Sequence, residues 1–478
     1  MARDSGARAM TDSTVAPPLK RHIAAVIAGN ALEFYDFLTF SYFAVYIGRA
    51  FFPASDPMTS LLTALATFGV GFATRPIGAV VIGGLGDRIG RKPATLLCFV
   101  MMGGAIIGLA LTPSYASIGP AASVIVVLLR LVQGFALGGE VGPTTAILIE
   151  AAPPGRRGFY GALQGASQFA STFFAGVIGF VLTSTLAPDV FAAYGWRIAM
   201  LIGAAVVPVG VFLMRDMPET APARTSQPER RALLKSNARV MLIGLAALGS
   251  ATVGVYVLLF IPNYAMQILH MPAQSTFAAT ILVGLCGAVF APLAGVASDR
   301  YGRKPVMIAL ALATLILIVP GFALLAHFRS WPALFAVAAI LSSLHASGGS
   351  VVIMAIPEAL PPAVRSGANA TVYALAIAIF GGSAQYVIAW LVKHTGDVLA
   401  PAYYWSAAAF IGLIAMTLLR ESAPGESRID LPLVGRSKNA KHFSGGGRGA
   451  RRSPHPKNRL ASLDAFSTSP QGGGKIGG

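Results

Sequence analysis

Polar and ionisable side chains lie inside long apolar stretches of this chain, where a charged group at the centre of a bilayer costs roughly 2.5 to 3.5 kcal/mol. Those of the first half are Asn30, Glu33, Asp36, Arg75, Arg130, Gln133 and Glu140. The first three are spaced by three residues, and the last three by three and seven, so each trio follows one face of a helix. The two arginines and three acids carry a formal charge of −1, which one proton or cation would neutralise. This pattern is typical of a proton-coupled site.

The apolar stretches of the second half contain no Asp or Glu, and their polar candidates are neutral. These are Tyr256, Asn263, His345, Tyr373 and Gln385. We therefore expect the coupling chemistry in the first half of the chain. Gln164 and Gln168, one helical turn apart, would either line a cavity or cross-link membrane helices. We interpret His345 as a packing residue rather than a proton relay.

The apolar stretches are the elements that must position these side chains. Hydrophobic residues make up 55% of the 478 residues and charged residues only 12%, values that a soluble core does not explain. Each bilayer crossing needs roughly 20 apolar residues. Twelve such runs lie near 22–47, 59–83, 94–112, 119–148, 161–185, 196–214, 239–263, 275–297, 306–326, 332–356, 368–392 and 402–420. The sequence thus predicts an all-α membrane protein of twelve transmembrane helices.

The net charge of +17 reports the topology of these helices. With the N-terminus inside, thirty of the 36 Lys and Arg residues fall on one side of the twelve-helix arrangement. The positive-inside rule then places both termini in the cytoplasm. Since topology explains the positive charge, we expect no nucleic-acid partner. The first run is too long for a signal-peptide core and lacks a cleavage site, so we expect it to remain as the first helix. The predicted location is the cytoplasmic membrane, with many passes through it.

A repeated loop divides the chain into two halves. GGLGDRIGRKP at 83–93 returns as GVASDRYGRKP at 295–305, and each copy lies between two apolar runs. The predicted organisation is a cytoplasmic tail at 1–20, six-helix halves at 21–214 and 239–420, a cytoplasmic linker at 215–238 and a basic, Gly- and Ser-rich disordered tail at 421–478.

The repeated loop resembles the signature of the major facilitator superfamily, G-x-L-x-D-R-x-G-R-K, although Ala297 replaces the leucine in the second copy. EAAPPGRRG from Glu150 and EALPPAVRSG from Glu358 form a second repeat, which resembles the sugar-porter-like branch. The resemblance implies a cytoplasmic gate that holds the two halves together; the alternative is that these charges only anchor loops. The gate residues would be Asp87, Arg88, Arg91, Glu150, Arg157, Asp299, Arg300, Arg303, Glu358 and Arg365.

Within the superfamily, GNALEFYDF, RPIG, RLVQGFALGGEVG and GFYGALQGASQ are similar to the metabolite:proton symporter group, and FFPASDP, SYASIG and TGDVLAPAYY are similar to its citrate-proton symporters. In proton-coupled sugar-porter-like carriers an aspartate of the first helix faces an arginine of the fourth. The resemblance therefore implies that Asp36 accepts the proton and that pairing with Arg130 favours its ionised form. Glu33 is the rival proton site, and a permanent ion pair that locks the helices is the structural alternative.

The expected function is proton-coupled import of citrate or another di- or tricarboxylate, with H⁺ as coupling ion and no cofactor. Candidate substrate contacts are Asn30, Arg75, Arg130, Gln133, Glu140, Gln164, Gln168, Tyr256 and Asn263. A zwitterionic compatible solute such as proline or betaine is the alternative, because Arg130 and Glu33 could bind its two charges. A membrane receptor or enzyme is a distant third, because the chain has no H-E-x-x-H or G-x-S-x-G motif and a receptor needs no duplicated gate. One chain with both halves can form the whole pathway as a monomer.

Overall fold

The computed structural model describes residues 19–89, 91–138, 148, 152–153, 155–205, 207–209, 212 and 236–421, and these are almost wholly helical. The linker predicted at 215–238 lies outside the described residues except for its last three, and so do nearly all of the two predicted tails. The described part belongs to one compact unit, Met1–Glu426.

The helices of the first half follow the expected apolar runs, several of them in two joined pieces. They are α1 (Leu19–Tyr42) with α2 (Ala44–Phe51), α3 (Pro57–Ala73) with α4 (Arg75–Ile89), α5 (Arg91–Leu111), the short α6 (Tyr115–Ile118) before α7 (Pro120–Leu137), α9 (Arg157–Thr185), and α10 (Pro188–Val190), the π-turn η1 (Phe191–Gly195) and α11 (Trp196–Gly203).

The second half repeats this order with longer unbroken helices. They are α14 (Ala238–Asn263) with the π-turn η2 (Tyr264–Ile268), α15 (Ala273–Tyr301), α16 (Arg303–Phe328), α17 (Trp331–Glu358), α18 (Pro362–Ala376) with η3 (Ile377–Gly381) and α19 (Gly382–Thr395), and α20 (Ala400–Leu418).

Ten of the described helical segments are long and apolar enough to cross a membrane. Two of the twelve expected runs are not among these ten. The run expected at 94–112 coincides with the shorter apolar helix Leu96–Leu111, and the run expected at 22–47 coincides with α1 and α2, which carry ionisable residues. Large apolar side chains point outwards, as at Val80 and Ile316, which are 76% and 67% exposed. Such surfaces suit lipid rather than water, and the predicted all-α membrane fold is confirmed.

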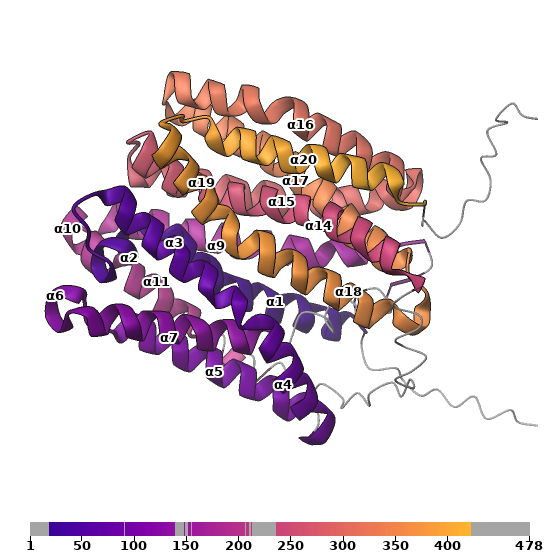
Figure 1. Cartoon of the computed structure of the whole chain (residues 1–478), viewed down its shortest axis with the longest axis horizontal. Helices are drawn as coiled ribbons and strands as arrows, with labels where there is room; N and C mark the ends of the chain where they lie inside the picture. The colour runs from indigo at the N-terminus through magenta and orange to yellow at the C-terminus, as the bar shows by residue number, and fades with distance from the viewer. Residues whose placement is uncertain are drawn as a thin grey trace, which may run out of the picture. The chain divides into compact units, whose positions relative to one another are not determined.

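The two halves pack against each other through small residues. Helices α9 and α15 run antiparallel, with Gly158 against Gly295 at one end and Ser184 bonded to Gln274 at the other. Gly284 lies so close to α9 that a Cβ there would approach a backbone nitrogen of α9 to 2.2 Å. Helix α3 packs in the same way on α19, and Figure 1 shows these two helices as neighbours. Glycines thus permit the close helix crossings that membrane helices use.

At one end of the helices, which we name the Asp56 face, an ion pair connects the two halves. Asp56 caps α3 by accepting hydrogen bonds from the backbone of Met58 and Thr59, and Lys393 of α19 lies 2.7 Å from the same carboxylate. Lys393 and these bonds hold the pKa of Asp56 well below its usual range.

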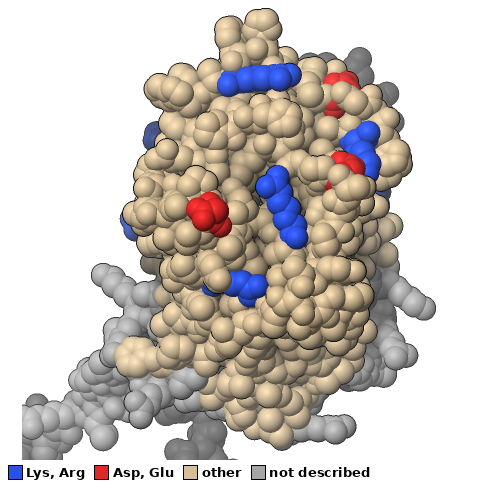
Figure 2. All heavy atoms as spheres, turned by 90° about the vertical axis from the view of Figure 1, so that its left-hand side faces the viewer, with Lys and Arg blue, Asp and Glu red and all other residues tan. Residues whose placement is uncertain are grey.

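Figure 2 views the side on which α6 and α10 lie in Figure 1, and that side carries only scattered charged side chains.

Candidate functional site

Asp36, Gln133 and Arg130 form a buried chain of hydrogen bonds between α1 and α7. The amide nitrogen of Gln133 donates to Oδ2 of Asp36 at 2.9 Å, and its amide oxygen accepts from Nη1 of Arg130 at 2.7 Å. All three residues are at most 3% exposed. The carboxylate and the guanidinium are therefore connected through the amide of Gln133, which occupies both of its polar ends in this contact.

Aromatic rings surround the arginines of this network. The guanidinium carbon of Arg130 lies 4.4 Å from the ring centre of Phe40, and that of Arg75 lies 4.3 Å from the ring centre of Phe72. Phe37 lies between them, 5.0 Å from Arg75 and 5.4 Å from Arg130. Cation–π contacts of this kind are worth about 2 kcal/mol when the cation is desolvated. The rings thus hold two positive charges in an apolar interior.

Each of the two arginines keeps a donor without a partner. The Nε atoms of Arg75 and Arg130 are buried and make no hydrogen bond within the described part of the chain. A buried donor left unsatisfied costs about 1 to 3 kcal/mol. An anion with two acceptor oxygens would remove this cost, and carboxylates fit the planar guanidinium well.

Tyr256 of α14 connects the arginine network to the second half. Its ring centre lies 5.8 Å from that of Phe72 and 6.5 Å from that of Phe37, in edge-to-face geometry. The same tyrosine lines a cavity between the halves, which we name the central cavity. Its polar lining residues are Gln168, Thr252, Tyr256, His345, Ser350 and Tyr373. Of the predicted substrate contacts, Gln168 and Tyr256 thus lie together at one cavity, and Nε2 of Gln168 has no hydrogen-bond partner among the described residues.

Two other predicted substrate contacts hold helices together instead of lining this cavity. Asn30 donates from Nδ2 to Oγ of Ser167 at 2.7 Å and to the carbonyl of Gln164 at 3.4 Å, which ties α1 to α9. Asn263 donates to the carbonyl of Ser41 at 2.8 Å. Ser41 also bonds to Gln385 of α19 at 2.9 Å, so these residues join the two halves between the central cavity and the Asp56 face.

The opposite end of the helices, which we name the Asp299 face, contains the second copy of the repeated loop. Asp299 accepts hydrogen bonds from the backbone of Gly158 at 2.8 Å and Phe159 at 3.1 Å, at the beginning of α9. Arg303 pairs with Asp299 at 2.8 Å and with both oxygens of Glu358, at 3.0 and 3.1 Å. A carboxylate of the second half therefore caps a helix of the first, where the helix dipole favours it.

The other predicted site residues are not part of this cluster or lie outside the described residues. Arg157 begins α9, and Arg300 lies over the ring of Tyr301, 5.3 Å from its centre. The undescribed side chains are those of Glu33, Asp87, Arg88, Arg91, Glu140, Glu150 and Arg365.

Several residues that shape the site did not stand out in the sequence. The phenylalanines around the arginines have the spacing of core residues, with Phe37 and Phe40 three apart and Phe68 and Phe72 four apart. The usable signal was that Phe40 lies one helical turn after Asp36, and Phe37 lies on the same face as Phe40. The pair Asp56 and Lys393 has no such signal, because 337 residues separate its members.

Comparisons with known proteins indicate one family and several transporters as relatives. A family model described as Major Facilitator Superfamily matches residues 26–291 and 277–454. A citrate-proton symporter of Klebsiella pneumoniae is 36% identical over 408 residues, which cover 84% of this chain and 92% of that protein. A proline/betaine transporter of Escherichia coli strain K12 is 30% identical over 426 residues, 85% of this chain and 84% of that one.

Solved structures show the same fold at lower identity. The crystal structure of a D-xylose-proton symporter superposes with a TM-score of 0.69 at 19% identity, and the match covers 85% of this chain and 99% of that chain. An inward-open structure of the xylose transporter XylE from Escherichia coli gives a TM-score of 0.66 at 18% identity, over 85% of this chain and 97% of that one.

Proposed function

Because the chain belongs to the major facilitator superfamily, we propose that it imports a small organic anion, citrate or another di- or tricarboxylate, together with protons. The carrying observation is the buried chain of Asp36, Gln133 and Arg130, which connects a titratable acid to an arginine whose Nε–H has no acceptor among the described residues. The protein is a transporter rather than an enzyme, and its cargo crosses the bilayer by alternating access of the site to the two faces.

The arginines favour an anionic substrate. Arg75 and Arg130 bring two positive charges to one apolar interior, and each has a buried Nε–H that lacks an acceptor among the described residues. A carboxylate accepts from guanidinium in charge-assisted bonds, which are about twice as strong as neutral ones. Citrate-proton symporters are relatives of 36% and 35% identity, which supports a tri- or dicarboxylate as the cargo.

Asp36 is the proposed proton acceptor. Its carboxylate is 2% exposed and reaches the charge of Arg130 through a single amide. A buried carboxylate is stable only while its hydrogen bonds last, so a movement of α1 against α7 that breaks the bond to Gln133 would favour uptake of a proton. Glu33 remains the rival proton site.

The two joined faces are the proposed gates. We assign the Asp299 face to the cytoplasm, since the basic loop 295–305 lies there and the positive-inside rule places such loops inside. The bonds from Asp299 to α9 and from Arg303 to Glu358 would break when this face opens. The pair of Asp56 and Lys393 would then close the outer face.

A compatible solute is the second candidate. A proline/betaine transporter at 30% identity and an ectoine/proline transporter of Corynebacterium glutamicum, also at 30%, are relatives that cover 85% of this chain. A zwitterion needs one cationic and one anionic partner, which Arg130 and an acid of α1 would supply.

Transport in liposomes tests the proposal directly. The purified protein is reconstituted, an inward proton gradient is imposed, and uptake of labelled citrate, proline and betaine is measured in parallel. We expect gradient-dependent accumulation of citrate, abolished by a protonophore. Accumulation of proline or betaine without citrate would transfer the function to the second candidate and contradict the role of the two arginines.

The proton site is tested by Asp36→Asn. We expect this variant to lose gradient-driven accumulation while it still exchanges labelled citrate for unlabelled citrate across the membrane, because exchange needs no net proton movement. Intact accumulation would exclude Asp36 as the proton acceptor. Glu33→Gln in the same assay distinguishes the rival site.

A further inference from the structure

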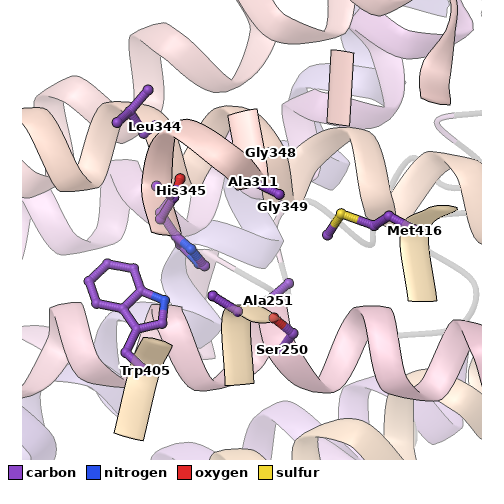
Figure 3. A pocket seen from close by; sticks show the side chains of 11 residues that line it. Ser250, Ala251, Ala311, Leu344, His345, Gly348, Gly349, Trp405 and Met416 are labelled. Atoms are coloured by element: carbon purple, nitrogen blue, oxygen red, sulfur yellow. The ribbon is translucent and has the colours of Figure 1, made fainter. Parts of the chain in front are cut away.

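His345 of α17 forms part of the wall between two cavities. It lines the central cavity together with Gln168 and Tyr256, and it also lines a second cavity, which we name the lateral cavity, between α14, α16, α17 and α20. Figure 3 shows the lateral cavity, with the imidazole ring directed towards Ala251 and the indole of Trp405 beside it. The histidine is 7% exposed. Neither the arginine network nor the gates use it.

The ring of His345 is held in place on three sides. Trp405 packs against it edge to face, with ring centres 5.5 Å apart. A Cβ at Gly254 would lie 2.3 Å from Cε1 of the imidazole, so only a glycine leaves room for the ring there. Ala251 of α14 lies beside the ring and lines the same two cavities. This packing fixes the orientation of the imidazole ring and therefore the direction in which Nε2 points.

That second nitrogen, Nε2, is buried and has no hydrogen-bond partner within the described residues. In a neutral imidazole one ring nitrogen carries the proton and the other presents a lone pair, so Nε2 is an acceptor when Nδ1 carries the proton. The residues that line the two cavities include no Asp, Glu, Lys or Arg, and their other titratable groups are Tyr256 and Tyr373. A positive imidazolium would therefore have no acidic neighbour to pair with.

We propose that Nε2 of His345 accepts a hydrogen bond from a hydroxyl group of the transported anion, so that the central cavity selects hydroxy-carboxylates. The inference rests on the proposed carboxylate transport. It adds that the second half of the chain recognises a hydroxyl group of the substrate. Gln168, on the α9 side of the same cavity, presents an amide nitrogen that has no partner in the described part of the chain and can donate to a carboxylate of the same molecule.

An acceptor at this position discriminates between anions by their hydroxyl group. A lone pair attracts an O–H group but repels a carboxylate oxygen, and a substrate without the hydroxyl leaves Nε2 buried and unsatisfied. Citrate carries one hydroxyl group on its central carbon, and tricarballylate is the same tricarboxylate without it. The difference between the two anions therefore isolates the proposed contact.

The test compares kcat/KM for citrate and tricarballylate in liposomes under one proton gradient. We expect the wild type to prefer citrate by about fivefold to tenfold, the ratio that one neutral hydrogen bond supports. His345→Leu should lower the citrate value alone and bring the ratio to about one. His345→Gln, which restores an acceptor oxygen, should recover most of the preference.

Ser347→Ala is the matched control, because Ser347 lies on the same helix but bonds to the carbonyl of Phe290 outside both cavities. It should keep the wild-type ratio. Equal loss of both anions in His345→Leu, or an unchanged citrate preference, would overturn the hydroxyl contact while citrate transport stands. If the wild type moves neither anion but accumulates proline, the proposed function fails and this inference fails with it.

Discussion

Replacement of Gln133 by leucine tests whether this amide serves the proton site or the substrate. In the structure both polar ends of Gln133 are occupied, one by Asp36 and the other by Arg130. Leucine fills a similar volume but offers no hydrogen bond. Gln133→Leu therefore removes the connection between acid and arginine and leaves the surrounding apolar packing largely in place.

The expected size of the effect follows from the bond that is lost. A hydrogen bond to a charged group is worth about 1.5 to 3 kcal/mol, and the ionised carboxylate of Asp36 loses one such bond at 2.9 Å. This destabilises the ionised form by about 10-fold to 150-fold relative to the protonated acid. The acid limb of the transport pH profile should move to higher pH by about one to two units.

The assay is citrate uptake in liposomes over a series of external pH values at a constant proton gradient, with citrate exchange as a second readout. Gradient-driven accumulation should fall, because the acid then stays protonated on both sides of the membrane. Exchange should continue with an unchanged KM. Thr67→Val is the control, since among the described residues its buried hydroxyl bonds to the carbonyl of Thr63, within its own helix.

A raised KM for citrate together with an unchanged pH profile would refute this reasoning. Gln133 would then contact the substrate, as the sequence alone suggested, and the chain of hydrogen bonds would not describe the proton-coupling state.

Three further changes test the two faces. Lys393 holds the pKa of Asp56 below its usual range. The stabilisation by this pair is therefore fully present above the unfolded pKa of about 3.9 and is lost as pH falls through the lower folded pKa. The difference in melting temperature between the wild type and Asp56→Asn should be small, constant near neutral pH and reduced only in strong acid. A Cβ at Gly69 would lie 2.3 Å from a backbone oxygen of α19, so Gly69→Val should keep the Asp56 face open. An impermeant thiol reagent should then label a cysteine introduced at Ser41 more strongly than in the parent protein. Equal labelling would exclude the contact of α3 with α19 as a gate. Asp299→Ala removes the acceptor of two backbone N–H groups of α9, a cap worth about 1 kcal/mol, and should change the rate of citrate exchange more than its KM; an effect confined to KM would contradict the gate.

The elements were predictable because the bilayer imposes a simple rule on them. Each crossing needs a run of apolar residues, so helices such as Arg303–Phe328 announce themselves by composition. The repeated loops at 83–93 and 295–305 likewise revealed the two halves. The breaks inside the runs were not predicted. Thr74 separates α3 from α4, and a π-turn separates α18 from α19, because such irregularities depend on the neighbouring helices.

Part of the site was also predictable from its chemistry. Asp36 and Arg130 are costly in a membrane, so their presence alone marked them as functional candidates. Their connection through Gln133 was not predictable, since the amide has the same spacing whether it bonds to a substrate or to a neighbour. Asn263 shows the same limit, because only its contact with Ser41 reveals that it joins the two halves.

The sequence by itself determined the membrane class, the twofold repeat, the family and the ionisable residues that must be buried, because each of these is written in local composition or in a motif. The tertiary structure decided which partners those residues have. Asp299 meets Gly158, Asp56 meets Lys393, and Nε2 of His345 meets none among the described residues. Such contacts join residues more than a hundred positions apart, and the packing of whole helices, rather than any local preference, brings them together.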